Sequence, residues 1–250
     1  MISVITPIYD IEKHLHNYAV NMRSLQKEFN GIREIILINN NPYEEICKDS
    51  VLSGLNGLKI IGNRKNLGYG GACNQGISIA KGKYMLILNP DVKITGHSLR
   101  KLISELIKSK EANIISCKLL NEDGSLQHSC RRFPTIKSLL ARRAPLFFSR
   151  IFSKELSAYN MDDYDHKNPI KVDWVSGALM LMKRKYFFDE RYFMYFEDVD
   201  LCRRVGEIYY YPFISAFHKA ERGSARDITL MIAHFSSALR YFLKFGLKKY

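Results

Sequence analysis

The chain opens with ISVITPI (residues 2–8), a short apolar run that contains Pro7 near its end. A run of this length, followed at once by a helical pattern, is typical of a strand that is buried on both faces. Residues 11–29 then carry apolar side chains at helical spacing, and Ile35–Ile38 is a second apolar run that stops at an asparagine-rich turn. The start of the chain therefore predicts the strand, helix and strand of a parallel sheet.

The same alternation continues to about residue 120. We expect further strands at Leu58–Ile61, Tyr84–Leu88 and Asn113–Leu119, and helices at about 43–53, 70–80 and 97–109. This order predicts an α/β fold with a mostly parallel central sheet and helices on both faces.

A different pattern begins after residue 120. Residues 121–170 hold turns, a basic stretch and an acidic cluster, and we expect a long excursion or lid there. Regular structure is expected again at Val172–Met182, in a helix from about Asp198 to Val205, in short strands near 208–216 and in a C-terminal helix at about 227–246.

Charge and composition narrow the class of protein. The 250 residues include 38 Lys and Arg against 25 Asp and Glu, so the formal net charge is +13 and the chain favours anionic partners. The five cysteines form no Cys-x-x-Cys pair, which argues against a zinc ribbon or a dithiol redox site. We find no signal-peptide pattern and no apolar run of 18 residues, and we therefore expect a cytoplasmic protein with reduced thiols and no transmembrane helix.

Polar residues follow four predicted strands at their carboxyl ends, the edge at which open α/β sheets bind ligands. These strand ends are Tyr9-Asp10, Asn39-Asn40, Asn63–Asn66 and Asn89-Pro90-Asp91. Residues 66–76 form a glycine-rich loop that leads into a helix, where backbone N–H groups could approach an anion. Because neither the dinucleotide fingerprint nor the P-loop spacing occurs, the loop predicts an anionic ligand without naming it.

Carboxylates at two places could carry chemistry. Asp91 could bind Mg²⁺ or Mn²⁺ that is held mainly by substrate phosphates, or it could simply close a turn. Glu197, Asp198 and Asp200 lie within four residues beside aromatic side chains, a setting that raises a carboxyl pKa as a general base requires. The alternative for Asp198 is a helix N-cap, and Asp200 is expected to pair with Arg203 or Arg204.

Together these segments resemble the inverting glycosyltransferase family 2, which has the GT-A fold. The matching segments are residues 2–9, Asn66-x-Gly68, Asn74-x-Gly76, Leu88–Asp91, Asp173–Ala178, Phe188–Glu190, Phe193–Cys202 and His218. Within the family the chain looks most like the bacterial rhamnosyltransferase group of O-antigen and cell-wall polysaccharide assembly, which Arg131–Thr135 also match. The resemblance covers residues 2–224 and is weak for the donor sugar.

The resemblance implies a set of residues that bind the nucleotide-sugar donor. Thr6, Pro7 and Tyr9 would line the nucleotide pocket, and Asn39 and Asn66 would lie near the base and ribose. The further donor-binding candidates are Gly68, Asn74, Asn89 and Arg204.

The resemblance also implies the groups around the reacting atoms. Asp91 would bind Mg²⁺ or Mn²⁺ on the donor diphosphate, and His218 would contact the diphosphate or the metal. Trp174, Ser176 and Gly177 would form the floor between donor and acceptor. Asp198 would be the general base, with Glu197 beside it.

Two positions depart from the family pattern. Asn39 stands where an Asp is usual, although its carbonyl can still accept from a pyrimidine N3–H. Asn89 replaces the first acid of the Asp-x-Asp motif, which removes one metal ligand and puts the dependence on a metal in question.

The implied activity is sugar transfer to a hydroxyl of a lipid-linked saccharide, with dTDP-rhamnose first among the donors and a UDP-hexose or galactofuranose donor left open. One domain would span residues 1–250, with a nucleotide-binding half (1–119), an acceptor and catalytic half (120–226) and a basic amphipathic C-terminal helix (227–250). The oligomeric state is left open.

Two activities of other classes compete with this interpretation. A sugar-phosphate nucleotidyltransferase needs a glycine-rich basic loop after the first strand, where this chain has residues 7–10. A nucleic-acid-binding module would need a basic and aromatic recognition motif that the chain lacks, so we expect no nucleic-acid partner.

Two basic segments predict an anionic membrane surface as a partner. Residues 131–154 hold seven Lys and Arg and no acid, and the tail from Ile228 also holds no acid. Basic amphipathic segments of this kind lie in membrane interfaces. We therefore expect a peripheral location on the cytoplasmic face of the inner membrane. The alternative is that the tail helix packs its apolar face on the domain.

Overall fold

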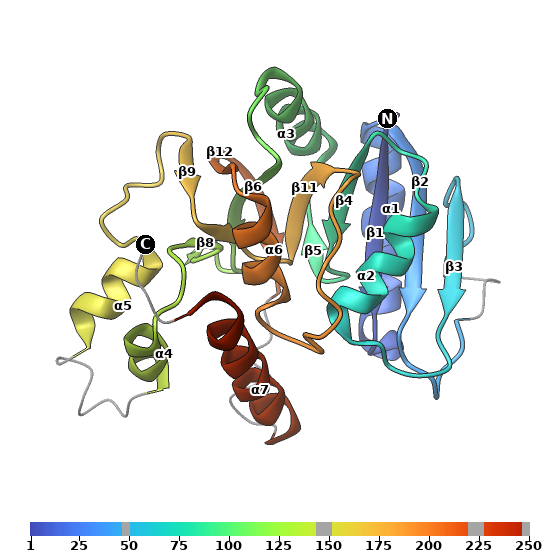
Figure 1. The fold of residues 1–250 in the computed structure, drawn as a ribbon. Coiled ribbons are helices and arrows are strands. Elements are labelled where there is room, and N and C mark those ends of the chain that lie inside the picture. The colour runs from blue at the N-terminus through green and yellow to red at the C-terminus, as the bar shows by residue number, and fades with distance from the viewer. Residues whose placement is uncertain (47–50, 144–151, 220–227, 247–250) are drawn as a thin grey trace.

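The computed structural model describes residues 1–46, 51–143, 152–219 and 228–246. Its main sheet has the strand order β3-β2-β1-β4-β11-β6-β12-β5, with β7 paired to β6 and β9 to β12 (Figure 1). The strands of the first half are β1 (Ile2–Ile8), β2 (Ile32–Asn39), β3 (Leu58–Gly62) and β4 (Tyr84–Leu88), and they are parallel. The expected alternation of strands and helices is confirmed in this half except between β2 and β3, where no helix is described.

Reversed strands enter the sheet in its second half. Strand β11 (Leu179–Lys183) is antiparallel to both β4 and β6 (Ile114–Leu120), and β12 (Ile208–His218) is parallel to β6. The short strands are β5 (Val92–Lys93), β7 (Leu126–Gln127) and β9 (Ile170–Val172). A separate ribbon pairs β8 (Cys130–Arg131) with β10 (Trp174–Val175). The expected α/β fold with a central sheet is confirmed, but the sheet is mixed, because β5, β7, β9 and β11 run antiparallel to their neighbours.

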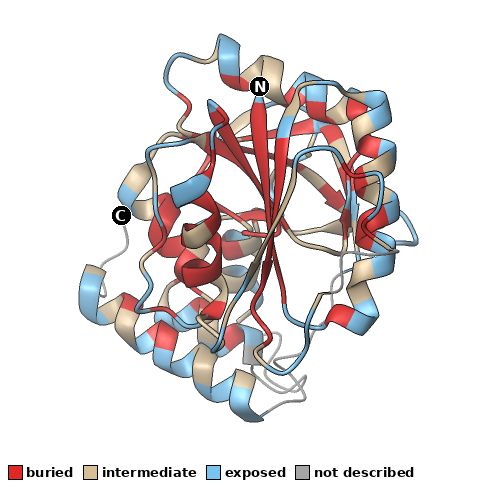
Figure 2. Cartoon of the chain, turned by 90° about the vertical axis from the view of Figure 1, so that its right-hand side faces the viewer, coloured by how far each residue is buried: buried red, intermediate tan, exposed pale blue. Residues whose placement is uncertain are grey.

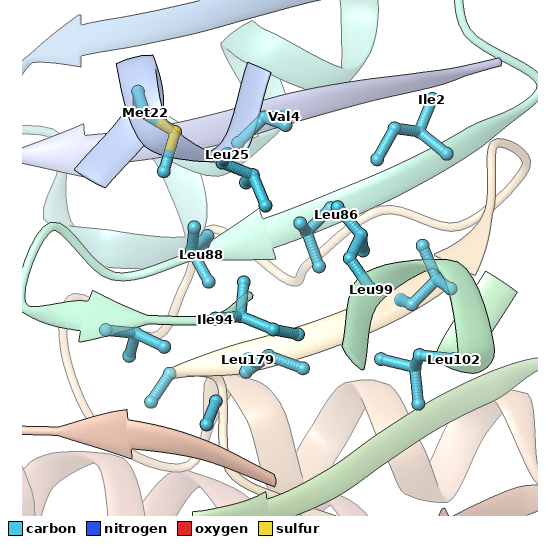
Figure 3. Packing of buried hydrophobic residues seen from close by; sticks show 14 of the residues in the cluster. Ile2, Val4, Met22, Leu25, Leu86, Leu88, Ile94, Leu99, Leu102 and Leu179 are labelled. Carbon is cyan, nitrogen blue, oxygen red and sulfur yellow. The ribbon is translucent and has the colours of Figure 1, made fainter. Parts of the chain in front are cut away.

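Helices cover both faces of the sheet because side chains alternate along each buried strand. Val4 packs in one core with α1 (Ile11–Glu28) and α3 (Gly96–Lys108), and Figure 3 shows this core from close by. Its neighbour Ile5 packs in a second core, which contains side chains of α2 (Gly68–Ile79), α6 (Glu197–Val205) and α7 (Ile228–Phe245). The central strands are buried along their lengths (Figure 2).

The expected helix at 43–53 is wrong for the residues that are described, and residues 47–50 lie outside them. Residues 43–46 and 51–53 form turns and irregular structure. Asparagine side chains close the preceding turn, since Asn39 Oδ1 accepts from Asn41 N (2.9 Å) and Asn41 Oδ1 accepts from Tyr43 N (3.0 Å). Such side-chain bonds to the backbone compete with a helix.

Two other expected elements have different bounds. The short strands expected near 208–216 are one strand, Ile208–His218, whose register with β6 shifts between Tyr211 and Ser215. Pro212 lies in that interval and has no N–H to give to a ladder, so a shift in register accommodates it. The 121–170 excursion contains β7, β8, α4 (Ile136–Arg143) and α5 (Ser153–Asn160), while residues 144–151 lie outside the described chain.

Candidate active site

The carboxyl ends of β1, β2 and β4 meet at one edge of the sheet, as parallel pairing requires. Thr6 and Pro7 lie within β1 and are buried there, whereas Tyr9 follows the strand and exposes half of its side chain. Asp10 caps α1 by accepting from Lys13 N (3.2 Å). The prediction that Thr6, Pro7 and Tyr9 line a nucleotide pocket stays a prediction.

Asn40 connects β2 to the glycine-rich loop. It lies at one of the predicted polar strand ends but is not among the predicted site residues. Its Oδ1 accepts from Leu67 N (3.0 Å) and Asn63 Nδ2 (3.1 Å). Its Nδ2 donates to Asn66 Oδ1 (2.8 Å) and Gly68 O (3.2 Å). Asn39 instead donates to Glu44 O (2.6 Å) and shapes the turn after β2. The side chains of Asn39 and Asn40 are both buried, so only their hydrogen-bond partners distinguish the two residues.

Gly68 allows the loop to lie directly against the segment that leads to α6. Its φ is +74°, and a Cβ there would come 2.1 Å from the Phe193 carbonyl oxygen. Tyr69 N donates to that same oxygen (3.0 Å). A glycine is required here because both the backbone angle and the close contact exclude a side chain.

Tyr69, another residue that sequence reasoning missed, joins three parts of the site. Its hydroxyl lies 2.7 Å from Gly177 O and 2.9 Å from Asn89 Oδ1. Burial raises the pKa of this hydroxyl, so Tyr69 stays protonated as a hydrogen-bond donor. A tyrosine beside a glycine-rich turn was visible in the sequence, but its partner at Gly177 was not.

Two predicted donor-binding side chains are engaged with the segment before α6. Asn74 donates to Phe188 O (3.0 Å) and Glu190 Oε1 (2.9 Å). Arg204 donates to Asp200 Oδ2 (2.6 Å), the pairing expected from the sequence, and to Phe187 O (2.8 Å). These bonds orient the acidic segment, and contact of either residue with a donor stays a prediction.

Asp91 and His218 lie together where β5 pairs with β12. His218 Nε2 is 3.5 Å from Asp91 Oδ1, and this carboxylate oxygen is buried and makes no hydrogen bond. His218 Nδ1 lies 2.9 Å from Gln127 Oε1, so the ring can donate there and keep Nε2 as a lone-pair ligand. A pocket of about 390 Å³ adjoins Asp91, and three lysines, Lys13, Lys93 and Lys219, help to line it.

A divalent cation fits this pair. An orphaned carboxylate oxygen beside a free imidazole nitrogen offers two ligands, and Mg²⁺ and Mn²⁺ accept further oxygens from substrate phosphates and water. Among the described residues no group of three or more His, Cys, Asp or Glu side chains could hold a metal. The protein alone therefore provides a partial site that a diphosphate would complete.

Glu197 and Asp198 begin α6 after two residues in the left-handed region. Tyr195 and Phe196 both have φ of +66°, a conformation that costs non-glycine residues about 1–3 kcal/mol each and is found at functional sites. Asp198 Oδ2 accepts from Gly177 N (3.0 Å), and Asp198 Oδ1 accepts from Val199 N (2.8 Å). The floor and the carboxylate are thus held in one fixed geometry.

The two neighbouring carboxyls differ in how readily they ionise. Burial raises the pKa of Glu197 well above its ordinary value, and the charge of Asp198 adds to this; Glu197 Oε2 is buried without a hydrogen bond. Burial also raises the pKa of Asp198, but the N–H groups of Gly177 and Val199 and the charge of Arg131 oppose that rise. Asp198 is therefore the member of the pair that ionises first, which is what a proton acceptor needs.

The residues predicted to form the floor lie in one segment, which contacts Asp198 through Gly177 N; their role as a floor stays a prediction. Trp174 lies in β10, and its Nε1 donates to Arg132 O (2.8 Å). Ser176 N donates to Ser129 O (2.8 Å), and a Cβ on Gly177 would lie 3.6 Å from Asp198 Cβ. Asn89, Gly177 and Asp198 are thereby connected through Tyr69, although up to 109 residues separate them along the chain.

A family model described as "Glycosyl transferase family 2" matches residues 3–189, three quarters of the chain. The chain belongs to glycosyl transferase family 2. This confirms the resemblance drawn from the motifs, and the enzyme is a glycosyltransferase.

Two curated relatives are similar over most of the chain. An N-acetylglucosaminyl-diphospho-decaprenol L-rhamnosyltransferase of Mycobacterium tuberculosis is 26% identical over 95% of this chain and 82% of its own. The rhamnosyltransferase WbbL of Escherichia coli is 28% identical over 70% of this chain and 68% of its own.

Solved structures confirm the GT-A fold. GalNAc-T7, crystallised with UDP, GalNAc and Mn²⁺, superimposes with a TM-score of 0.61 at 16% identity over 87% of this chain, which spans 43% of that protein's length. Mannosyl-3-phosphoglycerate synthase of Rubrobacter xylanophilus gives 0.58 at 11% identity, over 100% of this chain and 76% of that one.

Proposed function

We propose that this glycosyltransferase moves L-rhamnose from dTDP-rhamnose to a hydroxyl of a lipid-linked saccharide, with inversion at the anomeric carbon. The observation that carries the proposal is the setting of Asp198, held against the floor by Gly177 N beside a carboxyl that stays protonated. The two rhamnosyltransferase relatives support the sugar, and the printed name of the mycobacterial one supports a lipid-diphosphate acceptor.

The residues suggest how the step proceeds. Asp198 takes the proton of the acceptor hydroxyl, and the oxygen attacks C1 of the donor sugar from the face opposite the diphosphate. The C1–O bond to the diphosphate breaks, and the nucleoside diphosphate leaves with the electron pair. Tyr69 and Gly177 hold the floor between the two substrates, so the acceptor oxygen and C1 meet in one orientation.

Asp91 and His218 would hold the divalent cation, with the donor diphosphate supplying further ligands. When bound, such a cation offsets the charge that develops on the leaving group. GalNAc-T7, a protein of the same fold, was crystallised with Mn²⁺. A requirement for Mg²⁺ or Mn²⁺ is part of this proposal.

Calorimetric titration with dTDP, UDP, GDP and dTDP-rhamnose, with and without Mn²⁺, tests the donor. We expect selective binding of dTDP and its rhamnose conjugate, strengthened by Mn²⁺. A preference for UDP would keep the mechanism and replace the sugar by a UDP-hexose or galactofuranose. Absence of binding to every nucleotide would overturn the proposed activity.

We also propose that α7 rests on an anionic membrane surface. Among the described residues no helix is both long and apolar enough to cross a bilayer. One side of α7 packs inward through Ser237, Ala238 and Tyr241. The other side exposes between 55% and 78% of five large apolar side chains: Ile228, Ile232, Phe235, Leu239 and Leu243.

The charge of the C-terminal segment favours a lipid surface as the partner of the exposed apolar face of α7. From Ile228 to the end, the sequence holds cations and no acid, so two copies of α7 would repel each other while anionic lipid headgroups would attract it. The tail helix thus packs one face on the domain, as the alternative expected, and leaves a second apolar face outside. Lys248 and Lys249, together with the expected basic and apolar residues 144–151, lie outside the described residues.

Co-sedimentation with vesicles of phosphatidylglycerol and phosphatidylethanolamine tests this surface. We expect binding by the wild type and loss of binding in a Phe235→Ser, Leu239→Ser variant. Ile107→Ser is the matched control, because Ile107 is equally exposed on α3. Equal binding by all three proteins would contradict the assignment, and a dimer that the double substitution dissociates would replace lipid by a second copy.

A further inference from the structure

Arg131 is a partly buried cation that has aromatic neighbours but no acidic partner. It lies on β8, with its guanidinium carbon 5.3 Å from the centroid of the Trp174 ring and 5.6 Å from that of Tyr159. Its Nε is buried without a hydrogen bond, and within the described chain the side chain forms no ion pair. Burial lowers the pKa of the guanidinium, which shows that its charge is poorly compensated.

Two other cations with partly buried side chains have acidic partners. Arg204 bonds to Asp200, and Lys244 bonds to both Asp189 and Asp200. An arginine held by ring faces keeps the N–H groups at its edge available for an external acceptor. The missing partner at Arg131 therefore points to an anionic ligand.

The place of Arg131 indicates which ligand that is. Residues 129–133 lie along the floor, since Ser129 O and Arg132 O accept bonds from Ser176 N and Trp174 Nε1. The charge of Arg131 acts on Asp198 and opposes the rise in pKa that burial causes at this carboxyl. Asp91 and His218, at the β5–β12 pairing, are already suited to the donor diphosphate, so an unpaired cation on the strand beside the floor faces a different substrate.

We propose that Arg131 binds a phosphate of the acceptor, in the diphosphate that joins its first sugar to the lipid. The proposal rests on the proposed function. A hydroxyl that reaches Asp198 places the anomeric phosphate of the same sugar one ring away, and a guanidinium fork matches phosphate oxygens. The donor and the acceptor both carry a diphosphate, and the experiment shows which of the two Arg131 binds.

The test compares two acceptors of the same sugar: a short-chain lipid diphosphate and a neutral alkyl glycoside. For Arg131→Met we expect a rise of more than tenfold in KM for the diphosphate acceptor. Its KM for the donor and its KM for the neutral glycoside stay as in the wild type, and any change in kcat that follows from losing a positive charge near Asp198 is the same for both acceptors. Arg131→Lys retains part of the binding, because an ammonium keeps the charge and loses the fork.

Arg142→Met is the matched control, because Arg142 is exposed and stacks on the same Tyr159 ring; its kinetics should not change. An equal rise in KM for both acceptors, or a higher KM for the donor, would overturn the assignment. Direct titration of the lipid-diphosphate sugar without donor separates this inference from the proposed function. If the wild type binds that probe and Arg131→Met does not, the subsite stands even where no transfer is seen, whereas equal affinity removes it.

Discussion

The Asn40 side chain that holds the glycine-rich loop and the ionisable groups around the start of α6 differ in their hydrogen bonding. The amide oxygen and nitrogen of Asn40 each make two hydrogen bonds. Around α6, Glu197 Oε2 and Arg131 Nε are buried without a hydrogen bond. Buried polar atoms are normally paired, and unpaired ionisable groups gather at sites of chemistry. The bonds of Asn40 hold the loop in place, and we expect substrates to complete the bonding at the acidic turn.

The largest effect is expected from removing the proposed general base while the glycine-rich loop is left unchanged. Asp198→Asn should lower kcat by about 10²–10⁴-fold, because the proton acceptor is lost. Binding of dTDP should stay within a factor of about two, since the amide keeps the shape of the carboxylate. Steady-state transfer assays and titration of dTDP measure the two quantities. Turnover near that of the wild type would remove Asp198 from the base role.

The next largest effect is expected on stability, from a substitution in the glycine-rich loop. Gly68→Ala should lower the free energy of unfolding by about 2–3 kcal/mol, because φ of +74° disfavours a side chain and the Cβ would strike Phe193 O. Gly62→Ala is the control, since a Cβ there meets nothing within 4 Å. Urea unfolding of both variants measures the difference. Equal stability of the two variants would show that the loop does not need a glycine.

Asp91→Asn tests whether Asp91 acts as a metal ligand. We expect affinity for dTDP in the presence of Mn²⁺ to fall by at least about tenfold, or 1.4 kcal/mol, because a charged metal ligand is lost. Affinity measured with a chelator present should not change. If the two titrations shift together, Asp91 acts on the fold and not on a metal.

The smallest expected effect is a change of stability with pH that depends on Glu197. Burial raises the pKa of Glu197 above its ordinary value of 4.5, so the native state binds more protons than the unfolded chain above that pH. The free energy of unfolding then falls as pH rises through that window. Glu197→Gln carries no proton to lose, and its Tm should exceed that of the wild type by about 2–4 °C at pH 8 and by little at pH 4.

Calorimetric scans at the two pH values check this difference. A gain of the same size at both would mean that Gln packs better and that ionisation of Glu197 plays no part. A loss at pH 8 would mean that the carboxylate form is the one the fold stabilises.

Prediction from sequence succeeded where the signal is local. Apolar runs and helical spacing predicted β1, α1 and β4, and the family resemblance selected both Gly177 and Asp198, which the structure brings into contact. It failed at residues 43–46 and 51–53, where asparagine side chains shape the turn, and it favoured Asn39 although Asn40 holds the loop. Adjacent asparagines look alike in a sequence, and only their partners in the folded chain distinguish them.

The sequence by itself determined the alternation of strands and helices, the family and the identity of the two acidic segments, because side-chain periodicity and turn residues act over a few positions. Tertiary structure alone decided that Tyr69 meets Gly177 across 108 residues, that Tyr195 and Phe196 take positive φ, and that Arg131 Nε is buried without a hydrogen bond. Such features depend on packing between distant segments. Packing fixes burial and local charge, and these in turn set which carboxyl holds its proton and which cation lacks an acidic partner.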